Sequence, residues 1–182
     1  MERFKVNLRD QFQLSEIEAD QIVFFIQVMF SDLSKILVIL IPFAITGYLI
    51  EYLSILSLTF ILRTQSGGFH FKSYFSCLFF TGLYFVTITI LSTLSLSTSL
   101  LIILGVVHSI IIFLLSPMLS EQRKKLKSVN LKSLKIRSTA IAALLVSFYL
   151  IKTTPFTLCA IWVVISQGTL LLIQKGVLHV TR

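Results

Sequence analysis

The sequence predicts an all-α integral membrane protein: a polytopic helical bundle with about five full crossings, a short half-helix near a polar break, and an N-terminal amphipathic interfacial helix. Hydrophobic residues make up 55% of the 182-residue chain and charged residues only 13%, whereas a soluble domain carries about a quarter charged residues. No charged residue occurs between Lys72 and Glu121. As helix this stretch would reach about 70 Å, enough for two crossings of a hydrocarbon core about 30 Å thick.

The first 62 residues are expected to form the interfacial helix, one crossing and the half-helix. In residues 1–34, apolar residues recur every three or four positions over 17–33, which predicts a helix on the membrane surface or packed on the bundle. Residues 36–62 carry one charge, Glu51, and are too long for one untilted crossing and too short for two. We predict a crossing over 36–50 and a half-helix over 52–62, with one tilted span as the alternative.

The remaining crossings form two pairs. Residues 74–119 are predicted to cross twice, with a break in the Ser/Thr-rich stretch 91–99. Residues 138–174 contain only one charge, Lys152, and the sequence from Lys152 to Pro155 divides them into two shorter crossings. We expect residues 1–182 to form a single membrane domain.

Basic residues gather in the loop 120–137, which holds seven of them and one acid, Glu121. By the positive-inside rule this loop is cytoplasmic. Two crossings separate it from the polar break 63–77 and two from the tail 175–182, so parity places all three on the cytoplasmic side. The net charge of +8 is therefore interpreted as an orientation signal, and no nucleic-acid partner is expected.

The polar break 63–77 contains the candidate active site, with His70 and Cys77 as a catalytic pair. A cysteine attacks as the thiolate, and a nearby histidine can take its proton and later return it to a leaving group. On one continuous helix these two side chains would lie about 10 Å apart, too far for proton transfer at about 3 Å. The segment 67–70 is therefore expected to be non-helical and to fold back over a helix that begins near Ser73.

Several neighbouring residues favour this arrangement. Gly67 and Gly68 can adopt backbone angles that other residues avoid, and Ser73 is a suitable N-cap. Cys77 would then lie near a helix N-terminus, where the helix dipole favours an anion, and Lys72 and Arg63 add positive charge.

The pattern of the break resembles the accessory gene regulator B family, whose members are bacterial membrane cysteine endopeptidases that process the precursor of a cyclic autoinducing peptide in quorum sensing. The resemblance rests on Arg63, Thr64, Gly67, Gly68, His70 and Cys77. Ser116 and Pro117, followed by basic residues, resemble a second landmark of the family. The Asn-Lys-Pro element that often follows in the family is replaced here by SEQRKKLKS.

The resemblance implies a function and a location. Cys77 would form an acyl-thioester with the precursor, and a cysteine or serine of the peptide would then close a thiolactone or lactone ring. Precursors in the family carry an acidic C-terminal segment that leaves on cleavage. The chain would be a multi-pass protein of the bacterial cell membrane with its site facing the cytoplasm, and whether it forms a homodimer stays open.

Further residues are expected to bind the substrate or support the site: Arg63, Thr64, Gln65, Gly67, Gly68 and Lys72, together with a basic quartet formed by Arg123, Lys124, Lys125 and Lys127. His70 would be oriented by Gln65, Ser66 or backbone carbonyls, with Glu51 as the alternative.

Other sites are expected to be structural. His108 is interpreted as a helix-packing residue and Cys159 as a buried thiol. No HExxH or CxxC spacing occurs, so neither a metal nor another cofactor is expected. The rival interpretation of the chain is a non-catalytic small membrane transporter or peptide-export subunit.

Overall fold

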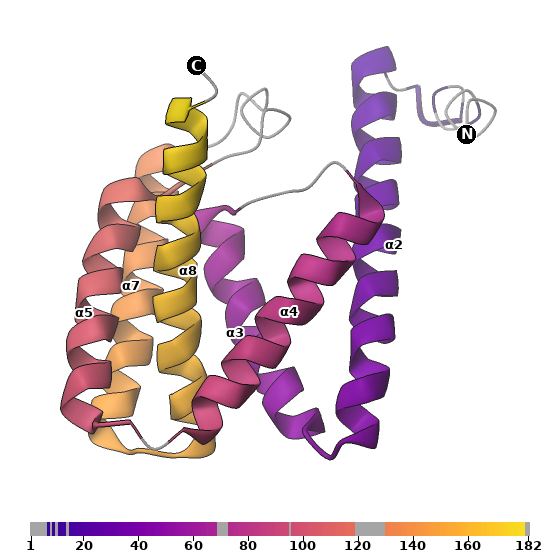
Figure 1. Ribbon diagram of the computed structural model, residues 1–182. Coiled ribbons are helices and arrows are strands. Elements are labelled where there is room, and N and C mark those ends of the chain that lie inside the picture. Colours follow the sequence, from indigo (N-terminus) through magenta and orange to yellow (C-terminus); the bar gives the residue numbers. More distant parts are fainter. Residues whose placement is uncertain are drawn as a thin grey trace. The chain divides into compact units, whose positions relative to one another are not determined.

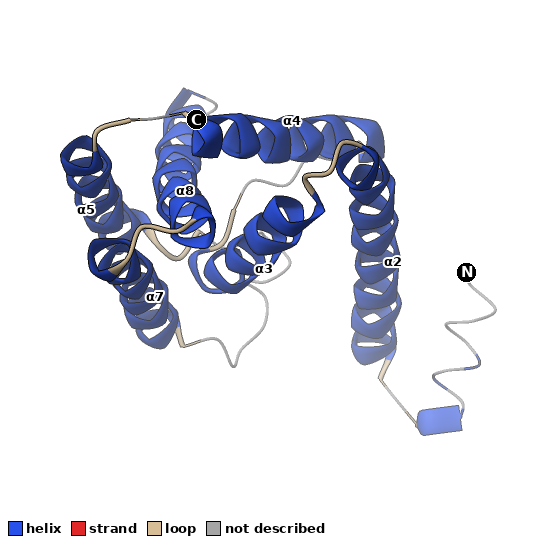
Figure 2. Cartoon of the chain, turned by 90° about the horizontal axis from the view of Figure 1, so that it is seen from below, coloured by secondary structure: helices blue, strands red, loops and turns tan. Residues whose placement is uncertain are grey.

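The computed structural model describes residues 7, 9, 11–13, 15–68, 73–94, 96–118 and 130–180. These residues form helices joined by short connections, and they contain no strand beyond one isolated bridge (Figures 1 and 2). The predicted all-α fold is therefore confirmed. The helices are α2 (Glu16–Ile45), α3 (Leu49–Ser66), α4 (Tyr74–Thr93), α5 (Thr98–Leu115), α7 (Leu131–Ile151) and α8 (Pro155–Val180).

Five of the described helices are long and apolar enough to cross a membrane. They are α2 from Glu18 onward, α4, α5, α7 and α8 up to Gly176. The number agrees with the five predicted crossings, and α3 is not among them. The chain is thus a multi-pass membrane protein.

Residues Met1–Ile45 form a compact unit of their own, built around α2. A capping box begins this helix, because Ser15 N donates to Glu18 Oε2 (2.9 Å) and Glu18 N donates to Ser15 Oγ (3.3 Å). The sequence predicted an interfacial helix and a separate crossing with a boundary near residue 35. The structure instead has one helix of 30 residues.

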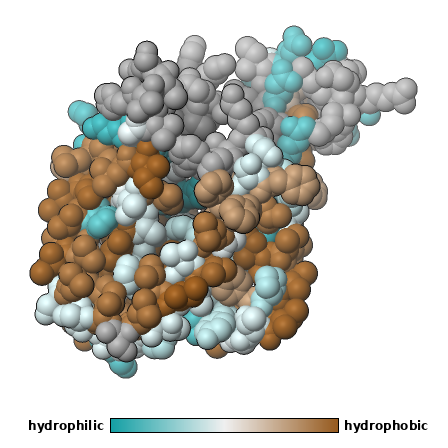
Figure 3. All heavy atoms as spheres, viewed as in Figure 1, coloured by the Kyte–Doolittle hydropathy of each residue, from teal (hydrophilic) through white to brown (hydrophobic). Residues whose placement is uncertain are grey.

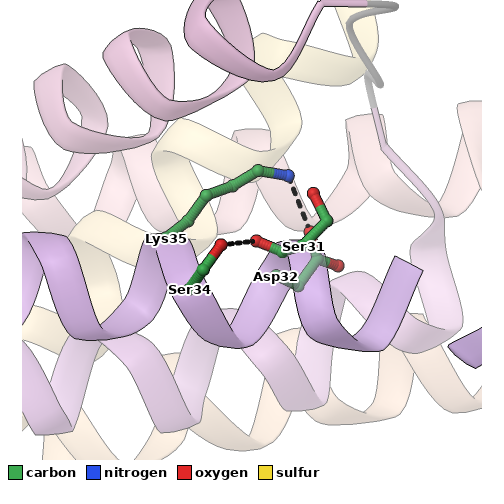
Figure 4. Close-up of polar contacts among 4 residues, drawn as sticks. All are labelled: Ser31, Asp32, Ser34 and Lys35. Carbon is green, nitrogen blue, oxygen red and sulfur yellow. Dashed lines mark hydrogen bonds and ion pairs between the residues drawn. The ribbon is translucent and has the colours of Figure 1, made fainter. Parts of the chain in front are cut away.

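Polar side chains near this expected boundary find partners within α2 itself (Figure 4). Lys35 Nζ lies 2.9 Å from Asp32 Oδ1, and Ser34 Oγ donates to the Ser31 carbonyl at 2.8 Å. Because these contacts span three residues along one helix, they support helical continuity where charge alone suggested a break.

The turn that was expected near residue 51 occurs earlier, over residues 46–48. Gly47 has φ +82° there, a backbone angle that favours glycine. As a result α3 begins at Leu49 and has 18 residues, more than the half-helix predicted over 52–62. Glu51 lies in its first turn, where a carboxylate interacts favourably with the helix dipole.

Residues Thr46–Arg182 form the second unit, with α8 as its central helix. α8 contacts α3, α4, α5 and α7, and its residues 159–165 are buried on every side of the helix. Large apolar side chains point outward elsewhere, such as Phe75 and Phe79 on α4, which are 77% and 67% exposed. Apolar residues accordingly cover much of the visible surface (Figure 3), as expected for a surface that faces lipid.

Candidate functional site

Residues 63–66 of the predicted polar break belong to the last turn of α3, and the first non-helical residue of the break is Gly67. Its backbone angles are φ 80° and ψ −170°, and its N–H donates to the Arg63 carbonyl at 2.9 Å. This region of backbone space is accessible almost only to glycine. A Cβ at this position would also overlap the carbonyl oxygen of Met118. Gly67 is therefore required both by its conformation and by the close approach of a second segment.

That second segment is 116–118, the landmark that follows α5. Gly67 and Met118 form a parallel bridge, and Met118 N donates to the Ser66 carbonyl at 3.0 Å. Ser116 Oγ lies 2.7 Å from Ser138 Oγ of α7 in a buried contact. The two motifs that carry the family resemblance, far apart in the sequence, are thus in direct contact.

A third element reaches the same point from α8. Gln167 is 1% exposed, and its Nε2 lies 2.8 Å from both Ser66 Oγ and the Gly67 carbonyl oxygen. Gln167 is not among the site residues predicted from the sequence. The available signal was an amide inside a long apolar segment, since polar side chains within a membrane helix are costly and usually have a specific role.

Cys77 lies in the first turn of α4. The helix begins at Tyr74 with Ser73 as the extended N-cap residue, as the sequence predicted, although the Ser73 side chain makes no cap hydrogen bond. Cys77 N donates to the Ser73 carbonyl at 3.1 Å. The Cys77 thiol is free and partly exposed.

The face of α4 that carries Cys77 is turned toward α3 and α8. Residues seven apart share a helix face, and Tyr84, seven residues after Cys77, has its hydroxyl 3.1 Å from Thr59 Oγ1 of α3 and 3.2 Å from Ser166 Oγ of α8. By contrast Phe75 and Phe79 are mostly exposed. The candidate nucleophile therefore belongs to the inward side of its helix.

The other expected site residues in the described part of the chain surround the end of α3. A Cβ at Gly68 would lie 2.5 Å from Nε of Arg63, so the Arg63 side chain packs on the Gly68 backbone. Thr64 Oγ1 donates to the Ile61 carbonyl at 3.0 Å. Gln65 Nε2 is 3.5 Å from Thr64 Oγ1, and among described residues Gln65 Oε1 is buried with no hydrogen-bond partner.

Some predicted site residues lie outside the described residues: His70, Lys72 and the basic quartet. The pairing of His70 with Cys77 therefore stays a prediction. Glu51 is 15 residues before Ser66 on the same helix, which corresponds to about 22 Å of helix. Glu51 therefore lies at the end of α3 that is farthest from the break. This position disfavours its carboxylate as the group that orients His70.

The remaining candidates are packing residues. His108 Nδ1 lies 2.7 Å from the Leu104 carbonyl oxygen and Nε2 lies 3.2 Å from Thr169 Oγ1 of α8. Cys159 is 1% exposed. Both agree with the structural roles expected from the sequence. Within the described ranges no three His, Cys, Asp or Glu side chains gather as a metal site would require.

Comparison with known proteins gives a consistent result. The Accessory gene regulator B family matches residues 2–171 of the chain. A curated AgrB-like protein from Clostridium beijerinckii is 29% identical over 173 residues, which cover 91% of this chain and 83% of that protein. No solved structure shows a significant match. The family match includes the break, the 116–118 segment and Gln167, and the chain therefore belongs to the accessory gene regulator B family, which functions in autoinducer peptide processing.

Proposed function

We propose that the protein is a membrane cysteine endopeptidase that cleaves an autoinducer precursor through an acyl-thioester on Cys77 and promotes its cyclisation. The observation that carries this proposal is the position of Cys77: a partly exposed thiol in the first turn of α4, on the face turned toward α3 and α8. Cys77 is the last residue of the polar break 63–77, and Ser66 and Gly67 of the same break are bound by Met118 and Gln167.

The chemistry uses two residues of the chain. His70 takes the proton of the Cys77 thiol, and the thiolate attacks the scissile carbonyl carbon of the precursor. The C–N bond then breaks, and His70 returns the proton to the departing amine of the C-terminal fragment. An acyl-thioester on Cys77 is left.

Release of the product follows by exchange. A cysteine or serine side chain within the bound peptide attacks the thioester carbonyl, a ring closes, and Cys77 leaves as the thiolate, which regains a proton. Exchange between thioesters is nearly isoenergetic, so hydrolysis is avoided only if water is excluded and the peptide nucleophile is held close.

The start of α4 is the best candidate for stabilising the oxyanion. The Gly67 amide is not available for this role, because it already donates to the Arg63 carbonyl. The Cys77 amide donates to the Ser73 carbonyl, but the amides that precede it in the first turn have no acceptor within the helix and would be free to donate to a carbonyl held at Cys77.

The positions of the helix ends support one direction for the site. The end of α3, the end of α5 and the start of α7 lie together, since Ser66 contacts Met118 and Ser116 contacts Ser138. The basic loop and the polar break therefore leave the bundle at one end. With the positive-inside rule, this supports a cytoplasmic site in which the basic quartet attracts the acidic segment of the precursor.

Substitution and trapping test the proposal. Cys77→Ala and His70→Ala should each abolish cleavage of the precursor in membranes while insertion persists, and Cys159→Ala, which removes a buried thiol, should cleave normally. Wild-type protein incubated with precursor should accumulate a hydroxylamine-sensitive adduct on Cys77. Normal cleavage by Cys77→Ala would refute the endopeptidase. Peptide export without any adduct would favour the transporter alternative.

A further inference from the structure

We propose that Gln167 is a positioning residue for the reaction, which holds the peptide plane at the start of the break and thereby aims the segment that carries His70. This inference rests on the proposed endopeptidase function. It begins from a buried amide of α8 whose hydrogen bonds among the described residues go to Ser66 and Gly67.

Burial makes the contacts of Gln167 consequential. Its side chain is 1% exposed inside a helix that is otherwise long and apolar. A buried polar group without partners is costly, so the amide is tolerated at this position because its donors are used. An amide nitrogen has two N–H groups, and here two acceptors, Ser66 Oγ and the Gly67 carbonyl oxygen, each lie 2.8 Å from Nε2.

The Gly67 carbonyl is the important acceptor. The peptide group is planar, so fixing this oxygen also fixes the direction of the Gly68 N–H. Gly67 sits in a conformation that only glycine adopts readily. Such a residue has several accessible backbone states, and an external contact is needed to select one of them.

The other contacts hold neighbouring groups or reach the Gly67 carbonyl only at a longer distance. Met118 N binds the Ser66 carbonyl at 3.0 Å, and Gly67 N binds the Arg63 carbonyl at 2.9 Å. Ser66 Oγ approaches the Gly67 carbonyl oxygen at 3.3 Å but is directed chiefly to the Leu62 carbonyl, at 2.9 Å. Gln167 therefore makes the shortest hydrogen bond to the Gly67 carbonyl among the described residues.

The test compares steady-state cleavage by Gln167→Met with that by wild-type protein. Methionine has a similar shape and no N–H donor, so the Gly67 carbonyl loses its shortest hydrogen bond and keeps only the longer one from Ser66 Oγ at 3.3 Å. We expect kcat to fall by about tenfold, which corresponds to the loss of one buried hydrogen bond. KM should change little, because the hydrogen bonds of Gln167 are made to Ser66 and Gly67 of the protein itself. Ser66→Ala keeps the bond to Gly67 and should lower kcat less.

Thr169→Val is the matched control, because it removes a contact between α8 and His108 of α5 without touching the break. It should lower the thermal midpoint without lowering kcat. Gln167→Leu also lacks both N–H donors and should resemble Gln167→Met in kcat.

Each result decides the inference. Wild-type kcat in either folded Gln167 variant would overturn it, as would a fall in kcat for Thr169→Val equal to that for Gln167→Met. If neither Gln167 variant folds, Gln167 is a stability residue and the inference is rejected. The proposed function fails separately, only if Cys77→Ala retains cleavage.

Discussion

Replacement of Gly67 by alanine is the sharpest test of the packed break. Two costs arise at this position. The backbone angles of φ 80° and ψ −170° cost a non-glycine residue about 1–3 kcal/mol. The new Cβ would also overlap the Met118 carbonyl oxygen and lie 2.7 Å from the Met118 carbonyl carbon, and such crowding costs about 1–3 kcal/mol more. Together they destabilise this junction by about 2–6 kcal/mol.

Two other glycines separate these costs. Gly47 has φ +82° with nothing within 4 Å of an added Cβ, so Gly47→Ala carries the backbone cost alone. Gly82 lies within α4 and is equally open, so Gly82→Ala carries neither cost and should stabilise the helix by up to about 1 kcal/mol. From the most to the least stable, the predicted order is Gly82→Ala, wild type, Gly47→Ala and Gly67→Ala.

The assay is thermal unfolding of purified protein in detergent, together with cleavage of the precursor in membranes. Gly67→Ala should have the lowest midpoint and lose cleavage, because the Ser66–Met118 contact and the aim of the break are both disturbed. A midpoint and a cleavage rate equal to those of Gly82→Ala would show that the close approach of residues 67 and 118 does not exist in the folded protein.

Three further predictions concern the Ser116–Ser138 contact, the basic quartet and the orientation of the chain in the membrane. A double-mutant cycle of Ser116→Ala and Ser138→Ala should give a coupling of about 1 kcal/mol in unfolding experiments, since one buried hydrogen bond of 2.7 Å joins them; additive effects would contradict the contact. Glutamine in place of the basic quartet should raise the precursor concentration for half-maximal cleavage and flatten its salt dependence, because screening acts over about 8–10 Å; an unchanged concentration dependence would leave the quartet as a topology signal only. In intact cells an impermeant thiol reagent should label Ser95→Cys and miss Ser128→Cys, and labelling of the latter would reverse the orientation.

The sequence was sufficient to predict the class of protein and its main segments. Hydropathy and charge are local properties, and a bilayer excludes charge from whole segments of about 20 residues. Counting charges between Lys72 and Glu121 therefore predicted two crossings correctly, and the start of α4 next to Ser73 followed from the residue types there. The boundary near residue 35 was wrong because polar side chains such as Lys35 and Ser34 bond within the helix.

The tertiary structure alone decided what surrounds the break. Ser66 and Gln167 are 101 positions apart in the sequence. The bridge from Gly67 to Met118 joins two segments that α4 and α5 separate along the chain. Neither contact has a periodicity or spacing that marks it in a sequence. Hydrogen bonds between helices depend on which faces meet and at what height, and these are set by the packing of α3, α5, α7 and α8 as a group. The sequence by itself thus determined which residues are chemically able to act, and packing determined which backbone groups hold them, because hydrophobicity is additive along a chain whereas the geometry of a contact is not.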